Sequence, residues 1–104
     1  MAWVYLIFAG LFEIVWATTM KLSNGFSKPL YAVTTVLTMM VSFGLLSLAL
    51  KTLPLGTAYT IWTGIGAIGA FVVGIVWMGD AVSALRIVAA ILIVSGLVLM
   101  KIST

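Results

Sequence analysis

Polar residues divide the chain into four long apolar stretches, which cover residues 2–20, 29–50, 56–78 and 84–102. A membrane-spanning helix needs about 20 mostly apolar residues, and each stretch is close to that length or above it. Only helices and closed barrels satisfy the backbone in lipid, and these continuous stretches are far longer than the alternating strands of a barrel. We therefore expect an all-α integral membrane protein, with residues 1–104 forming one domain of four transmembrane helices.

The composition supports a membrane protein and excludes several other classes. Hydrophobic residues make up 64% of the chain and charged residues 7%, whereas a soluble domain carries about 25% charged residues. Cysteine and histidine are absent, which excludes disulfides and thiolate metal sites, and we expect no metal and no cofactor. No nucleophile–base pair or phosphate loop indicates an enzyme. No basic cluster with interleaved aromatic residues indicates a nucleic-acid partner.

The positive charges give almost no orientation bias. With four spans, Lys21, Lys28 and Arg86 fall on one side of the membrane, and Lys51, Lys101 and the terminal amine fall on the other. Orientation normally follows an excess of Lys and Arg in short cytoplasmic loops. Two interpretations stay open. Either another feature sets the orientation, or the chain inserts both ways and forms an antiparallel pair.

Glu13 is the only charged residue inside the first apolar stretch. A carboxylate within the membrane is costly to hold, and it is by default a functional hypothesis. Its helical neighbours three residues away are Gly10 and Trp16, because residues three and four apart share a helix face. The glycine leaves room for a ligand or a partner helix, and the indole offers a flat wall with one N–H donor.

A proton and a cation would compete for the Glu13 carboxylate. Burial disfavours the charged form of a carboxyl group, and a bound cation favours it. A protein that opens alternately to each side of the membrane would then exchange protons for cations. An antiparallel dimer would supply two copies of Glu13 at a shared site near the midplane, as inverted repeats do in larger transporters.

The third stretch carries a polar and aromatic face formed by Tyr59, Trp62, Thr63 and Gly66. Its hydrogen-bonding groups would be costly to point at lipid, so we expect this face to pack toward Glu13. The aromatic rings could then favour a cation by cation–π attraction. Ser42 in the second stretch is a further candidate donor, although a lone serine in such a helix more often bonds to a neighbouring helix.

Glycines gather in the third stretch, where Gly64, Gly66 and Gly69 predict close helix packing or a hinge. The same residues match the pattern GxGxxG, but a dinucleotide site needs a preceding strand and a βαβ unit. Neither is predicted in a membrane span. In the fourth stretch the small residues Ser95 and Gly96 predict the dimer contact.

Two segments of the sequence resemble the small multidrug resistance family. These are residues 9–26, which read AGLFEIVWATTMKLSNGF, and residues 51–70, which read KTLPLGTAYTIWTGIGAIGA. The resemblance covers essentially the whole chain. It implies a dual-topology antiparallel homodimer in the bacterial inner membrane that exports small organic cations against protons. It also implies that Glu13 is the shared proton and substrate carboxylate, with Ser42, Tyr59 and Trp62 around it.

Within that family the chain looks most like the guanidinium-exporting branch, because of Trp16 and Lys101. The implied substrates are guanidinium and small guanidinyl or quaternary ammonium cations. Residues 17–21 read more like the drug-exporting branch, so an exporter of quaternary ammonium and aromatic drugs is the alternative. A heterodimer with a related chain also stays open. A membrane accessory protein that transports nothing and a proton-carrying rotor proteolipid are more remote alternatives.

Overall fold

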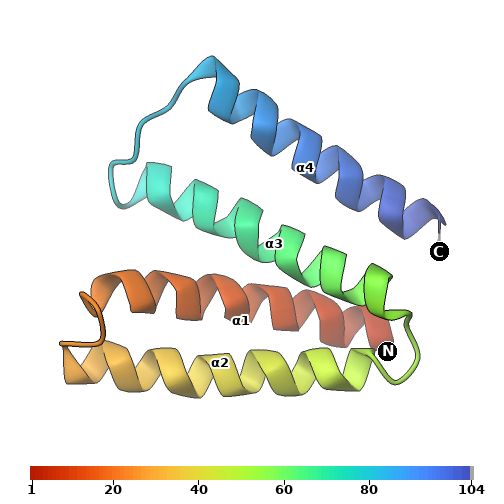
Figure 1. Cartoon of the computed structure of the whole chain (residues 1–104), viewed down its shortest axis with the longest axis horizontal. Coiled ribbons are helices and arrows are strands. Elements are labelled where there is room, and N and C mark those ends of the chain that lie inside the picture. The colour runs from red at the N-terminus through yellow and green to blue at the C-terminus, as the bar shows by residue number, and fades with distance from the viewer. Residues whose placement is uncertain (104) are drawn as a thin grey trace.

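The computed structural model describes residues 1–103, which form four helices joined by short connections (Figure 1). Helix α1 spans Ala2–Leu22, α2 spans Pro29–Ala49, α3 spans Leu55–Val76 and α4 spans Ala84–Ser103. Each is long and apolar enough to cross a membrane, which confirms the predicted all-helical architecture with four spans. The observed bounds differ from the predicted ones by at most two residues.

A left-handed turn ends α1. Gly25 and Phe26 have φ angles of 72° and 65°, which cannot continue a right-handed helix. The buried Ser23 hydroxyl donates to the Met20 carbonyl oxygen at 2.6 Å and accepts the Phe26 N–H at 3.0 Å. The turn thus satisfies backbone groups that the end of α1 leaves unpaired.

Proline and glycine residues mark the starts of α2 and α3 and the end of α3. Pro29 is the first residue of α2 and Pro54 caps α3, where the missing proline N–H is tolerated. After α3, Gly79 has a φ of 73°, and the Asp80 N–H donates back to the Gly74 carbonyl oxygen at 2.9 Å. This reversal closes α3 and leads the chain into α4.

The helices lie side by side in the order α2, α1, α3 and α4 (Figure 1). Helix α1 packs against both α2 and α3, whereas α4 packs mainly along α3. The molecule is only 16 Å across its shortest axis, and a single helix with its side chains is about 10–12 Å wide. The protomer is therefore a thin slab, with little room for an enclosed central chamber.

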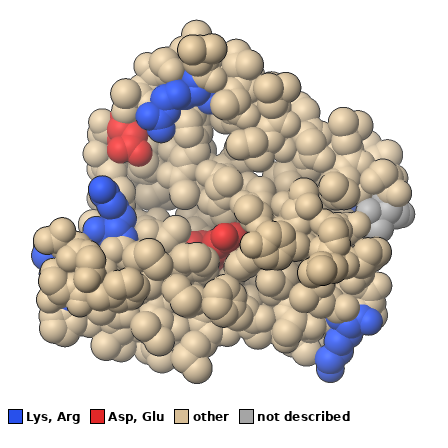
Figure 2. Space-filling model, viewed as in Figure 1, with Lys and Arg blue, Asp and Glu red and all other residues tan. Residues whose placement is uncertain are grey.

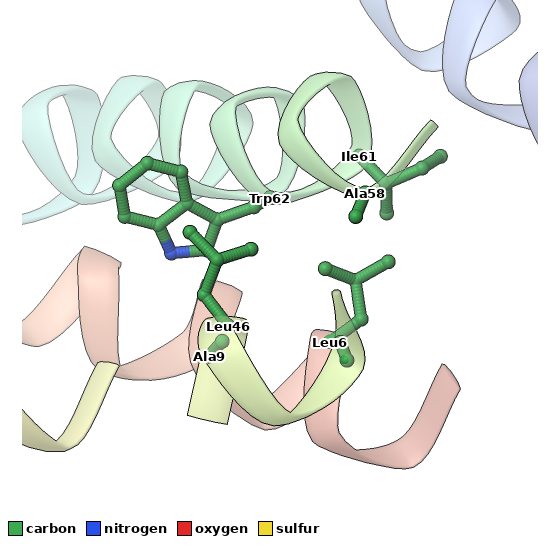
Figure 3. Packing of buried hydrophobic residues seen from close by; sticks show 7 residues of the cluster. Leu6, Ala9, Leu46, Ala58, Ile61 and Trp62 are labelled. Carbon is green, nitrogen blue, oxygen red and sulfur yellow. The ribbon is translucent and has the colours of Figure 1, made fainter. Parts of the chain in front are cut away.

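The buried apolar core is small and joins α1, α2 and α3 near one end of the bundle. Figure 3 shows Trp62 of α3 lying toward Leu46 of α2, with Leu6 of α1 and Ile61 of α3 close by. The whole cluster is Leu6, Ala9, Leu46, Ala49, Ala58, Ile61 and Trp62. Helix α4 contributes no buried residue.

Candidate functional site

The Glu13 carboxylate lies against α3 at a position that only glycine leaves open. A Cβ atom built on Gly66 would overlap the Glu13 Oε1 and Cδ atoms. The two residues therefore fit together. Because Gly66 of α3 has no side chain, the Glu13 carboxylate of α1 can occupy the space beside it. Figure 2 shows acidic atoms in a hollow near the middle of this face, with Lys and Arg nearer the edges.

Two buried polar atoms of α1 have no hydrogen-bond partner among residues 1–103. They are Oε1 of Glu13 and Nε1 of Trp16. Leaving a buried donor or acceptor unpaired costs about 1–3 kcal/mol, so native proteins rarely keep two so close together. One atom accepts hydrogen bonds and the other donates them, and the residues are one helical turn apart. This arrangement suits a bound molecule better than a sealed core.

Ser42 and Trp62 hydrogen-bond to each other and tie three helices together. The Trp62 Nε1–H of α3 donates to Ser42 Oγ of α2 at 3.0 Å, and Ser42 Oγ donates to the Ala9 carbonyl oxygen of α1 at 2.7 Å. Both side chains are buried. The single hydroxyl proton of Ser42 is thus engaged, and the serine acts as a helix–helix bond in this conformation.

Four aromatic rings form a row that begins at Trp16, one helical turn from Glu13. Trp16 and Phe43 have ring centroids 6.3 Å apart, Phe43 and Trp62 are 5.7 Å apart, and Trp62 and Tyr59 are 5.6 Å apart. The first two pairs meet edge to face. Phe43 was not among the predicted site residues, because one phenylalanine in an apolar helix gives no distinguishing signal. The residue connects the predicted Trp16 and Trp62.

The predicted polar face of α3 is divided between two sides of the helix. Trp62 is buried and bonds to Ser42 of α2, and Gly66 is buried against Glu13 of α1. Tyr59 is 54% exposed, and it lines with Thr63 a cavity of about 510 Å³ between α3 and α4. Within one protomer, Tyr59 is therefore linked to the Glu13 region only through its ring contact with Trp62.

The predicted glycine positions are close contacts in a continuous helix. A Cβ atom on Gly64 would overlap Leu97 of α4, and one on Gly69 would overlap Ile14 of α1. On α1, a Cβ atom on Gly10 would come within 2.7 Å of Ile65 Cβ, so this glycine adjoins α3 instead of open space. Helix α3 runs without a break through all three of its predicted hinge glycines.

The predicted dimer residues lie on the open surface of α4. Ser95 and Gly96 are exposed, and no heavy atom outside the local chain lies within 4 Å of a Cβ atom built on Gly96. A larger side chain at this position would therefore meet open space in the isolated protomer. Gly96 also borders the cavity between α3 and α4.

A second cavity, of about 300 Å³, lies between α1 and α3 toward the end of the bundle that carries Lys21 and Asp80. Ala17, which lines it, is one turn along α1 from Glu13, and Lys21 and Asp80 line its outer part. The complete lining is Ala17, Thr18, Lys21, Ala70, Val73, Gly74, Met78 and Asp80. Glu13 itself does not line this cavity.

Comparison with known proteins identifies close relatives. A family model described as "Small Multidrug Resistance protein" matches residues 1–93. A protein named "Guanidinium exporter" from Escherichia coli K12 is 48% identical over 104 residues, which cover 100% of this chain and 99% of the relative. The protein of that name from Salmonella typhimurium is 48% identical over 103 residues, or 99% and 98% of the two chains. The Citrobacter freundii protein of the same name is 45% identical over 104 residues, which cover 100% of this chain and 99% of that protein.

Proposed function

The chain belongs to the small multidrug resistance family, and from that premise we propose that it is a proton-coupled antiporter for guanidinium and small guanidinyl or quaternary ammonium cations. Together with four apolar helices, family membership makes it a multi-pass protein of the bacterial inner membrane and an exporter of small cations. The proposal extends to the proton coupling, the substrate and the residues of the site.

The proposal rests on the two buried atoms without hydrogen-bond partners in the described part of the chain, Glu13 Oε1 and Trp16 Nε1. Guanidinium is planar and cationic, and it can meet a carboxylate with two parallel hydrogen bonds. Glu13 Oε1 has no partner among residues 1–103, so it is free to accept such a bond. The aromatic row that begins at Trp16 would attract the cation through its ring faces. The carboxylate thus supplies charge, and the rings supply a wall for a flat ligand.

The proposed proton coupling follows because the proton and the substrate cation bind to the same carboxylate, that of Glu13. An unpaired charge in the membrane is costly, so we expect Glu13 to hold a proton when no cation is bound. A cation that arrives replaces that proton, because both require the same oxygen atoms. Return of the proton would then release the cation on the other side of the membrane.

Access from both sides requires more than one protomer conformation. The cavity that Ala17 lines, one turn from Glu13, lies toward the end that carries Lys21 and Asp80, and the slab is 16 Å thick. We propose that a second, inverted copy of the chain provides access from the opposite side of the membrane. The nearly balanced positive charges at the two ends allow the chain to insert in both orientations. Tyr59 and Thr63, which face away from the Glu13 of their own protomer, could line the completed site. The alternative of a heterodimer with a related chain predicts no transport from this chain alone.

The test is transport by the purified chain in proteoliposomes with an imposed pH gradient. Guanidinium, tetramethylammonium and a bulky aromatic cation would each be offered to the wild type and to Glu13→Gln. We expect guanidinium uptake with counter-movement of protons, and we expect Glu13→Gln to abolish both. The control is Asp80→Asn, which removes the only other acid of the chain and should retain transport. Guanidinium movement without protons would overturn the antiport mechanism.

A multidrug exporter is the second candidate. The cavity of about 510 Å³ beside Tyr59 has a mostly apolar lining that includes Leu92 and Leu97, which would suit larger aromatic cations. Transport of only the bulky cation in the same assay would favour this candidate. Transport of guanidinium and tetramethylammonium without the bulky cation would exclude it.

A further inference from the structure

The end of the bundle opposite Lys21 and Asp80 contains a cavity that plays no part in the proposed transport site. It has a volume of about 550 Å³ and lies where α1 begins and α2 ends. Figure 1 places the start of α1, the turn between α2 and α3, and the end of α4 at this same end of the molecule. Its principal lining residues are Trp3, Tyr5, Leu48, Lys51, Thr52 and Leu53.

The cavity is flanked by two lysines and no acidic side chain. Lys51 lines it directly, and the Lys101 ammonium of α4 lies 4.1 Å from the ring centroid of Trp3, which also lines it. The two acids of the chain are elsewhere, because Glu13 lies against Gly66 and Asp80 lies against Gly74. This end of the protomer therefore has positive charge that no side chain of the protein offsets.

The polar groups of the cavity are donors without acceptors. Within residues 1–103 the Lys51 ammonium, the Thr52 hydroxyl and the Tyr5 hydroxyl make no hydrogen bond to another residue. An ammonium has three donor hydrogens and no acceptor, and each hydroxyl can also donate. A group of donors around positive charge complements an anion that has several acceptor oxygens, and phosphate is such an anion.

The position of the cavity matches the headgroup layer of a bilayer. Helix α1 has 21 residues, and at 1.5 Å per residue it is about as long as the hydrocarbon core is thick. Its first turn, with Trp3 and Tyr5, is therefore expected at the membrane–water boundary, where these two residue types are enriched. Leu48 and Leu53 add apolar wall to the same cavity, next to the polar donors.

We propose that this cavity binds the phosphate of an anionic phospholipid headgroup. Lys51 and Thr52 contact the phosphate oxygens, Lys101 adds charge from across the Trp3 ring, and the leucines contact the apolar part of the lipid next to its headgroup. Basic pockets between transmembrane helices bind anionic lipids by this combination of charge and apolar contact. The site lies within one protomer, so the proposal depends neither on the transport assignment nor on the dimer.

The test is binding of lipids to the full-length chain in detergent, measured by native mass spectrometry. Phosphatidylglycerol and phosphatidylcholine with the same short acyl chains would be titrated separately, since they differ in net headgroup charge. We expect phosphatidylglycerol to bind at least about tenfold more tightly. Lys51→Gln should weaken its binding about fivefold, given the usual contribution of one lysine near a membrane surface.

Matched variants make the test specific. Lys28→Gln removes the lysine that precedes α2, at the opposite end of the bundle, and it should leave phosphatidylglycerol binding unchanged. Lys51→Arg should preserve binding. Lys101→Gln provides a second measure if Lys51→Gln does not fold, and we expect a smaller loss of about two- to threefold. Circular dichroism would confirm that each variant is folded.

Three results would overturn the proposal. Equal affinity for the two lipids would remove the role of headgroup charge. An equal loss with Lys28→Gln would mean that net charge alone acts, without a built site. Displacement of phosphatidylglycerol by inorganic phosphate at equal concentration would identify a soluble phosphate site and would exclude the lipid as its specific ligand.

Discussion

Helices α1, α2 and α3 are joined by polar contacts, whereas α4 is attached mainly by apolar ones. Ser42 accepts a hydrogen bond from Trp62 and donates one to the Ala9 carbonyl oxygen, and the hydroxyls of Thr19 and Thr35 lie 2.7 Å apart between α1 and α2. Helix α4 has no buried residue and packs mainly along α3, with Lys101 over the Trp3 ring of α1. The same chain therefore contains a three-helix unit with a defined interior and a fourth helix with an open face.

The difference shows how helices associate when lipid surrounds them. Exposed apolar side chains are not penalised in lipid, so association depends on hydrogen bonds and on small residues that let backbones approach. The three-helix unit has both, with Gly66 against Glu13 and Gly69 against Ile14. Helix α4 approaches α3 where Gly64 leaves room for Leu97. We infer that the three-helix unit holds the chemistry and that α4 is available for a second subunit.

After Glu13→Gln itself, the largest expected effect comes from filling the space beside Glu13. Gly66→Ala places a methyl group where the carboxylate now lies, so the acid must leave its position between α1 and α3. We expect guanidinium transport in proteoliposomes to fall at least about tenfold, a loss equivalent to about 1.4 kcal/mol.

The matched control is Gly44→Ala in α2, because no heavy atom outside the local chain lies within 4 Å of a Cβ atom built there. This variant should transport normally. Normal transport by Gly66→Ala as well would show that the site works with Glu13 away from α3. It would contradict the inference that the packing of the three-helix unit holds the chemistry.

A bulky residue on α4 should separate subunits without disturbing the protomer. Gly96→Leu meets open space in the isolated chain, but it would block close approach of a second α4. We expect the dimer dissociation constant, measured by energy transfer between labelled chains in lipid, to rise about tenfold. Gly96→Ala should have an intermediate effect, and helical content should not change. An unchanged dissociation constant for Gly96→Leu would place the dimer contact elsewhere.

The smallest expected effect concerns the bond that joins the three helices. Ser42→Ala removes one link to Ala9 and another to Trp62, and we expect a loss of about 1 kcal/mol in the free energy of unfolding. Steric trapping or unfolding in mixed micelles would measure it. Ser47→Ala is the matched control, because the exposed Ser47 hydroxyl bonds only within α2, to Gly44 at 2.8 Å.

A double-mutant cycle with Trp62→Phe would isolate the hydrogen bond itself. We expect a coupling energy of about 0.6 kcal/mol, which is the usual size for such bonds in membranes. Zero coupling would mean that Trp62 is held by packing alone.

The helices and the central acid could be predicted because lipid imposes simple rules. A span must be apolar and about 20 residues long, so hydropathy alone located all four helices to within two residues. Glu13 was conspicuous because few other residues in the spans are ionisable. The neighbours of Glu13 on its own helix followed from the helical repeat, which does not depend on tertiary structure.

The contacts between helices could not be predicted in the same way. Tyr59, Trp62, Thr63 and Gly66 cover an arc of about 100° at 3.6 residues per turn. Helix α3 has neighbours on two sides, and the edge of that arc with Trp62 meets α2 while Thr63 borders α4. The choice between these sides depends on the relative rotation of whole helices, on which the pattern of one helix carries no information.

Phe43 and Ser42 show the same limit at single positions. Apolar residues cover every side of a lipid-facing helix, so Phe43 does not stand out as a contact between Trp16 and Trp62. The acceptor of Ser42 is a backbone carbonyl of another helix, and every residue has such a group. Only the packed structure shows which carbonyl is within reach.

The position of the two chain ends limits how copies of this protein can be fused into one gene. Four spans return the chain to its starting side, so the start of α1 and the end of α4 lie at the same end of the bundle (Figure 1). A short linker that joins the end of one copy to the start of another would hold both copies in the same orientation. An inverted pair in a single polypeptide needs a linker that itself crosses the membrane. Tandem duplication of this sequence would therefore favour parallel copies, and an inverted repeat could evolve from it only by gaining or losing a helix.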